Sequence, residues 1–102
     1  MITGTLSNGF NFSLEERKLK TYRFTELLGR CASADANERL DANRRVLPYL
    51  IGEDGKEALL AYIEEQTGEE ALEKDVTALT IEIINAAKAE DEEIKKSQPS
   101  PQ

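Results

Sequence analysis

The chain has 102 residues, of which 39% are hydrophobic and 32% are charged, and its formal net charge is -7. This length fits one domain that buries its own core, and the acidic balance argues against nucleic-acid binding because phosphate backbones would be repelled. The chain has no histidine and a single cysteine, which excludes the commonest zinc ligand, the usual general base and an intrachain disulfide.

The chain also lacks the sequence features of exported and membrane proteins. It does not open with a basic segment followed by a long apolar run, so we expect no signal peptide. No stretch approaches the roughly 18 apolar residues of a membrane span. We therefore expect a cytoplasmic protein, in keeping with the single cysteine.

Charge is divided unevenly along the chain. Residues 1–51 carry a balance of +2, and residues 52–102 carry -9. A solvated acidic helix surface is the simplest interpretation. The gradient also leaves open the steering of a basic partner and head-to-tail association of copies.

Residues 1–14 predict a β-hairpin with Asn8 and Gly9 in its turn. A two-residue loop would place Phe10 and Phe12 opposite polar side chains. A three-residue loop instead puts the apolar side chains on one face, with the pairs Leu6–Phe10, Gly4–Phe12 and Ile2–Leu14. A lone hairpin is marginal in water, so this face must be covered by helices or by another chain.

Two helices are predicted after a charged connection over 15–20. The first spans about 21–34, where four apolar side chains share one helical face: Phe24, Leu27, Leu28 and Cys31. The second starts at Asp35, with Glu38 in the capping-box position, and its inward residues are Leu40, Val46, Leu47 and Leu50. Pro48 should break or kink this helix, and Gly52 should end it.

Two further helices complete the predicted domain. One spans about 54–66, with Gly68 as its terminator, and it carries Leu59, Leu60, Tyr62 and Ile63. The last and longest spans about 69–96, with Thr67 and Glu70 as a cap and an inward stripe of Leu72, Val76, Leu79, Ile83 and Ala87.

The predicted fold is thus mainly α in an α+β arrangement. It is a single domain over 1–96 with an N-terminal hairpin over 1–14 and about four helices. The proline-containing end, 97–102, is expected to be a disordered tail.

No motif in the sequence predicts catalysis, a cofactor or a metal site. Cys31 lies on an apolar helix face, which is typical of an inert thiol. Carboxylate pairs such as Glu64 and Glu65 have no accompanying signal of a cleft. We therefore expect no enzyme activity.

Four apolar residues are candidates for contact with another protein. Ile81 lies roughly opposite the stripe of the last helix, and Ile84 lies on its flank. Phe10 and Phe12 belong to the hairpin face that needs a cover. Single exposed apolar residues are common, so each of these is also compatible with an ordinary surface position.

In chain order, four segments resemble the small tail assembly chaperones of bacteriophages and prophages with long non-contractile tails. They are LSNGFNF at 6–12, ELL at 26–28, LIG at 50–52 before a helix with Leu59, Leu60 and Glu64, and an acidic last helix running into KSQPSPQ at 96–102. Lys18, Lys20, Arg23 and the pair Arg44-Arg45 depart from the usual pattern of the family.

The resemblance implies a non-enzymatic assembly factor. Proteins of this family bind and solubilise the tape-measure protein and help to recruit tail-tube subunits, and many have a longer form made by frameshifting. The resemblance places the chain in the host bacterial cytoplasm and outside the mature virion, with homo-oligomers left open. The alternative, motivated by the acidic second half, is a regulatory adaptor or inhibitor, such as an antitoxin-like protein or a nucleic-acid mimic.

Overall fold

The computed structural model describes the backbone of residues 1–97 and the side chains of residues 1–90. Its elements are β1 (Ile2–Thr5), β2 (Asn11–Leu14), the 3-10 helix η1 (Glu16–Lys20), α1 (Tyr22–Cys31), α2 (Ala36–Thr67) and α3 (Glu73–Ser97). The predicted mainly helical fold with one antiparallel hairpin is confirmed. The predicted tail lies outside the described residues, except for Ser97, which is the last residue of α3.

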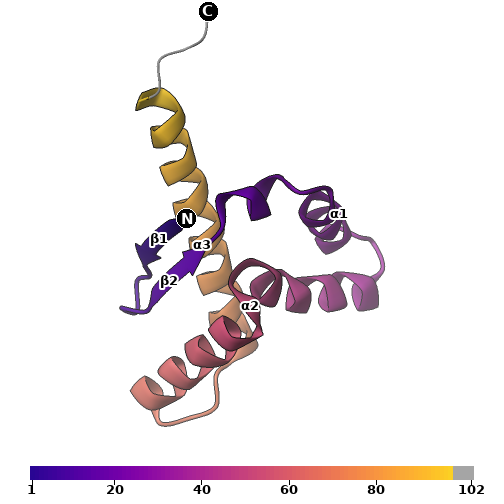
Figure 1. The fold of residues 1–102 in the computed structure, drawn as a ribbon. Coiled ribbons are helices and arrows are strands. Elements are labelled where there is room, and N and C mark those ends of the chain that lie inside the picture. Colours follow the sequence, from indigo (N-terminus) through magenta and orange to yellow (C-terminus); the bar gives the residue numbers. More distant parts are fainter. Residues whose placement is uncertain (98–102) are drawn as a thin grey trace, which may run out of the picture.

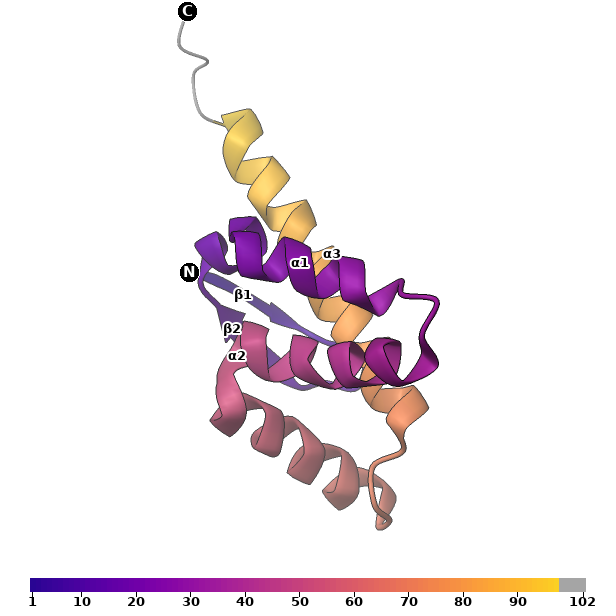
Figure 2. The same cartoon turned by 90° about the vertical axis from the view of Figure 1, so that its right-hand side faces the viewer.

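The elements surround one core. In Figure 1 the hairpin lies along α3, and α1 and the first half of α2 lie to the right of both. In Figure 2, α1 and the first half of α2 run side by side in opposite directions, and the second half of α2 turns back beneath them. No helix in the described part of the chain is both long and apolar enough to cross a membrane.

The hairpin has the predicted register, with Ile2 opposite Leu14 and Gly4 opposite Phe12. The Leu6 amide donates to the Phe10 carbonyl at 2.8 Å, which closes the three-residue loop. A Cβ on Gly4 would lie 2.8 Å from the Phe12 ring, so the small residue is required for the aromatic ring to lie across the strand. The apolar face of the hairpin is therefore part of the core.

The hairpin turn is held by both long helices. The Ser7 amide and hydroxyl donate to the two carboxylate oxygens of Glu82 on α3, at 2.9 and 2.7 Å. The Tyr62 hydroxyl and the side-chain amide of Gln66, both on α2, donate to the Asn8 backbone carbonyl at 3.2 and 2.9 Å. The turn thereby connects two helices that are distant from it in sequence.

We expect Gly9→Ala to destabilise the protein, whereas Gly29→Ala should stabilise it slightly. Gly9 has a φ of 94°, and an added Cβ would lie 2.8 Å from the Tyr62 hydroxyl oxygen, so the cost should be about 1–3 kcal/mol. Gly29 lies within α1 with nothing near its Cβ position, and alanine there should add about 0.5–1 kcal/mol. Urea denaturation measures both changes, and equal midpoints would contradict the role of the turn.

The prediction of about four helices is slightly off, because the second and third predicted helices are joined as α2. The helix continues through Pro48, and its one non-helical residue is Gly52, with φ 81° and ψ 165°. Only glycine adopts such a conformation without strain, so the bend falls there instead of at the proline.

The predicted helix starts are right for α2 and wrong for α3. Asp35 caps α2 by accepting the amides of Asn37 and Glu38. The predicted cap of the last helix is not formed, because Thr67 is the last residue of α2 and its hydroxyl donates to the Ile63 carbonyl at 3.0 Å. Gly68 ends α2 with φ 74°, as predicted, and α3 begins only at Glu73.

The core contains residues of the hairpin and of all three α-helices. Its largest fully buried side chains are those of Phe24, Ile2, Leu59 and Ile83. The predicted stripe of the last helix is largely confirmed, since Leu79, Ile83 and Ala87 are buried. Leu72 is exposed because it precedes the first turn of α3, so helical periodicity does not apply to it. Leu40 is also exposed although it shares a helical face with Leu47, because a face is buried only where another element covers it.

Candidate binding groove

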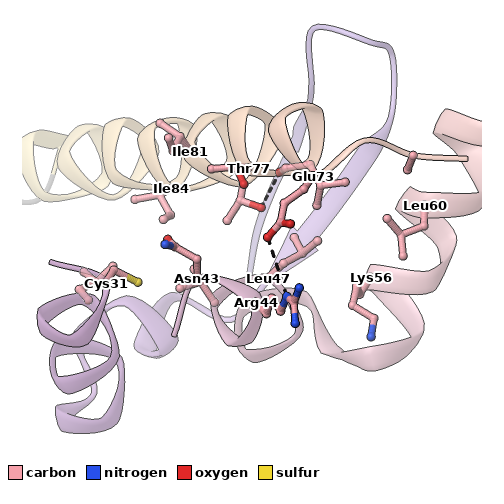
Figure 3. Close-up of a pocket in the computed structure, with 15 residues that line it drawn as sticks. Cys31, Asn43, Arg44, Leu47, Lys56, Leu60, Glu73, Thr77, Ile81 and Ile84 are labelled. Atoms are coloured by element: carbon pink, nitrogen blue, oxygen red, sulfur yellow. Dashed lines mark hydrogen bonds and ion pairs between the residues drawn. The ribbon is translucent and has the colours of Figure 1, made fainter. Parts of the chain in front are cut away.

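An apolar groove of about 440 Å³ lies between α3, α1 and both halves of α2. Figure 3 shows α3 forming one wall, with α1 and the two halves of α2 opposite it. Most lining residues are apolar: Leu28, Cys31, Val46, Leu47, Leu60, Ala71, Val76, Ile81 and Ile84; the rest are Asn43, Arg44, Lys56, Glu73, Thr77 and Thr80.

The α3 wall of the groove is made by a helix that uses two of its faces. Leu79, Ile83 and Ala87 are buried in the core. On another face, Thr77, Ile81 and Ile84 follow one another at i, i+4 and i+7 and line the groove, where Ile81 is 53% exposed and Ile84 is half-buried. The structure therefore brings the two predicted contact residues of the last helix together on one wall.

The deeper part of the groove offers little to a polar ligand. Val46 and Leu47 of α2 are buried there. Thr80 is buried too, and its hydroxyl donates to the Val76 carbonyl of its own helix at 2.8 Å. Since that donor is already satisfied, an occupant gains chiefly by covering apolar surface.

Charged groups lie at the rim of the groove. An ion pair joins Arg44 Nε of α2 to Glu73 Oε1 at the start of α3, 3.8 Å apart, and Figure 3 shows it crossing from one wall to the other. Lys56 Nζ is held by Glu53 at 2.8 Å and by Glu57 at 3.5 Å. The hydrogen bond to Glu53 is the main cause that raises the pKa of Lys56.

Cys31 lies at the α1 end of the groove and is partly exposed. Burial raises the pKa of its thiol, and the neighbouring Arg30 guanidinium offsets part of that rise. A thiol with a raised pKa is a weak nucleophile at neutral pH. As the single cysteine of the chain, Cys31 can instead report on whether the groove is occupied.

The two predicted contact residues of the hairpin do not line the groove. Phe12 is buried, 4% exposed, because α2 and α3 of the same chain cover the hairpin face, so its prediction as a partner contact is wrong. Phe10 is half-buried, and its ring meets the Tyr62 ring edge-on with centroids 5.6 Å apart. The apolar face of the hairpin is thus buried by helices of the same chain.

The sequence reasoning missed the α1 and α2 sides of the groove, although a signal for them exists. Three pairs of adjacent apolar residues each have a buried first member and a half-buried second member that lines the groove: Leu27-Leu28, Leu59-Leu60 and Ile83-Ile84. Adjacent helical side chains point about 100° apart, so one member of such a pair can pack in the core while the other lines the groove. The second residue of each of these three pairs lines the groove, whereas Ile51 of the similar pair Leu50-Ile51 lines a different surface.

Comparison of the chain with protein-family models, curated protein sequences and solved structures finds no match.

Proposed function

We propose that the chain is a protein-binding module that shelters an amphipathic helix of another protein in this groove. The observation that carries the proposal is the half-exposed apolar side chain of Ile81 on the wall of a groove whose lining is mostly apolar. A helix laid into an apolar groove is a common mode of recognition, with anchors at i, i+3 or i+4 and i+7. The walls come from three helices, so the groove forms only in the folded domain.

Within that class, the resemblance of the sequence to tail assembly chaperones favours a particular role. The chain would hold the tape-measure protein soluble in the bacterial cytoplasm, help to recruit tail-tube subunits, and leave before the virion is complete. A long helical protein exposes apolar stripes until it assembles, and a groove such as this one would cover them. Self-association of the chaperone is compatible with this role.

The acidic regulatory adaptor is the second candidate, and its supporting observation is the net charge of -7. The two functions differ in the force that holds the partner. Apolar burial persists in high salt, whereas attraction between exposed charges is screened as the Debye length falls from ~10 Å at 0.1 M to ~3 Å at 1 M.

The proposed role requires a tape-measure protein in the same genome, and a salt titration of its complex with this chain tests the proposal. We expect the dissociation constant to change less than about tenfold between 0.1 and 1 M salt, because the contact is mainly apolar. A loss of binding by several orders of magnitude would favour the acidic adaptor. The rate of Cys31 alkylation provides a second readout, since an occupied groove should slow it.

A further inference from the structure

The ion pair across the groove joins two side chains that are both well exposed. Arg44 is 67% exposed and Glu73 is 57% exposed, at a separation of 3.8 Å. Exposed pairs of this kind contribute little to stability. Glu73 also lies in the first turn of α3, where the helix N-terminus stabilises a carboxylate without help from Arg44. The guanidinium can therefore exchange this partner at little cost.

Arg44 is the groove cation that remains available to a ligand. Lys56 is engaged by two carboxylates. The next residue, Arg45, is 65% exposed but lines a different surface between α1 and α2, where its Nε is 2.9 Å from Asp41. Two adjacent arginines of similar exposure thus differ in their surroundings, and only Arg44 lies at the groove.

We propose that Arg44 selects a partner helix with a carboxylate beside its apolar stripe. The inference rests on the proposed function, since it specifies the charge that the occupant of the groove carries. In the free protein Glu73 holds the guanidinium at the rim. When a helix docks, its Asp or Glu side chain replaces Glu73 and forms a paired contact that the apolar surroundings shield from water. The acidic chain therefore recognises an acidic flank on its partner instead of a basic one.

Three synthetic amphipathic helices of about 20 residues test the proposal. They share one leucine stripe and differ only in the residues that flank it, which are Glu, Gln or Lys. Fluorescence anisotropy measures binding, and protection of Cys31 from alkylation locates it. We expect the Glu peptide to bind about tenfold more tightly than the Gln peptide, and the Lys peptide to bind most weakly.

Variants of the chain separate Arg44 from general charge effects. Arg44→Ala should weaken the Glu peptide about tenfold and leave the Gln peptide unchanged, whereas the matched control Arg45→Ala should change neither. Glu73→Gln should tighten the Glu peptide, because it removes the competitor for Arg44. All three residues are well exposed, so we expect each variant to fold. Circular dichroism checks this.

The outcomes distinguish this inference from the proposed function. If all three peptides bind equally and protect Cys31, the groove binds helices but Arg44 selects nothing, and the inference fails alone. If Arg45→Ala weakens the Glu peptide as much as Arg44→Ala does, the effect is one of overall charge and the inference fails as well. If no peptide binds or protects Cys31, both proposals are wrong.

Discussion

Ile83→Glu is expected to unfold the domain. The Ile83 side chain is fully buried at 0% exposure, at the centre of the face that α3 presents to the core. Burying an unpaired carboxylate there should cost about 4 kcal/mol or more, a large share of the ~5–10 kcal/mol expected for a domain of this size. Circular dichroism and urea denaturation measure the loss of helix and of cooperativity.

The same substitution two residues earlier is the control for this result. Ile81 is 53% exposed, so Ile81→Glu should change the free energy of unfolding by less than about 1 kcal/mol. Equal destabilisation by the two variants would mean that the core-facing side of α3 is assigned wrongly. A fully folded Ile83→Glu variant would have the same meaning.

Ile81→Glu is expected to weaken binding in the groove strongly while the domain remains folded. The new carboxylate would lie on the apolar wall where the docked helix must exclude water, and it would remain unpaired. The loss should be at least about 2 kcal/mol, or roughly thirtyfold in the dissociation constant. Titration of the Glu-flanked synthetic helix measures it.

A matched exposed residue outside the groove checks that the effect is local. Tyr22 begins α1, is 81% exposed and does not line the groove. Tyr22→Glu should leave both binding and stability near the wild-type values. Unchanged binding by Ile81→Glu would place the partner on another surface.

The parts of the fold that were predicted correctly depend on contacts close in sequence. The hairpin register follows from the requirement that Ile2, Phe12 and Leu14 share one buried face, and a slip of one residue would expose all of them. The end of α2 follows from Gly68, whose left-handed conformation stops the helix without strain.

The parts that were predicted wrongly depend on which elements meet. Leu40 has the spacing of an inward residue, but no element covers it. Residues 69–72 carry helix-favouring glutamates, yet α3 starts only at Glu73, after a connection in which Ala71 lines the groove. Local propensity does not report such tertiary arrangements.

The candidate site was predicted in part. Helical phase alone separates Ile81 and Ile84 from the buried stripe of α3. The same reasoning failed for Phe12, because a single strand pattern does not show whether its cover comes from the chain or from a partner. The Arg44–Glu73 pair joins residues 29 positions apart, so no local pattern could have predicted it.

If the chain is a tail chaperone, its genome also encodes a long helical tape-measure protein, and co-expression of the two tests the central claim most directly. The wild-type chain should keep that protein in the supernatant after cell lysis and centrifugation, and the folded Ile81→Glu variant should let it precipitate. A long helical protein that is equally soluble with both chains, or insoluble with both, would contradict the claim that the groove shelters it.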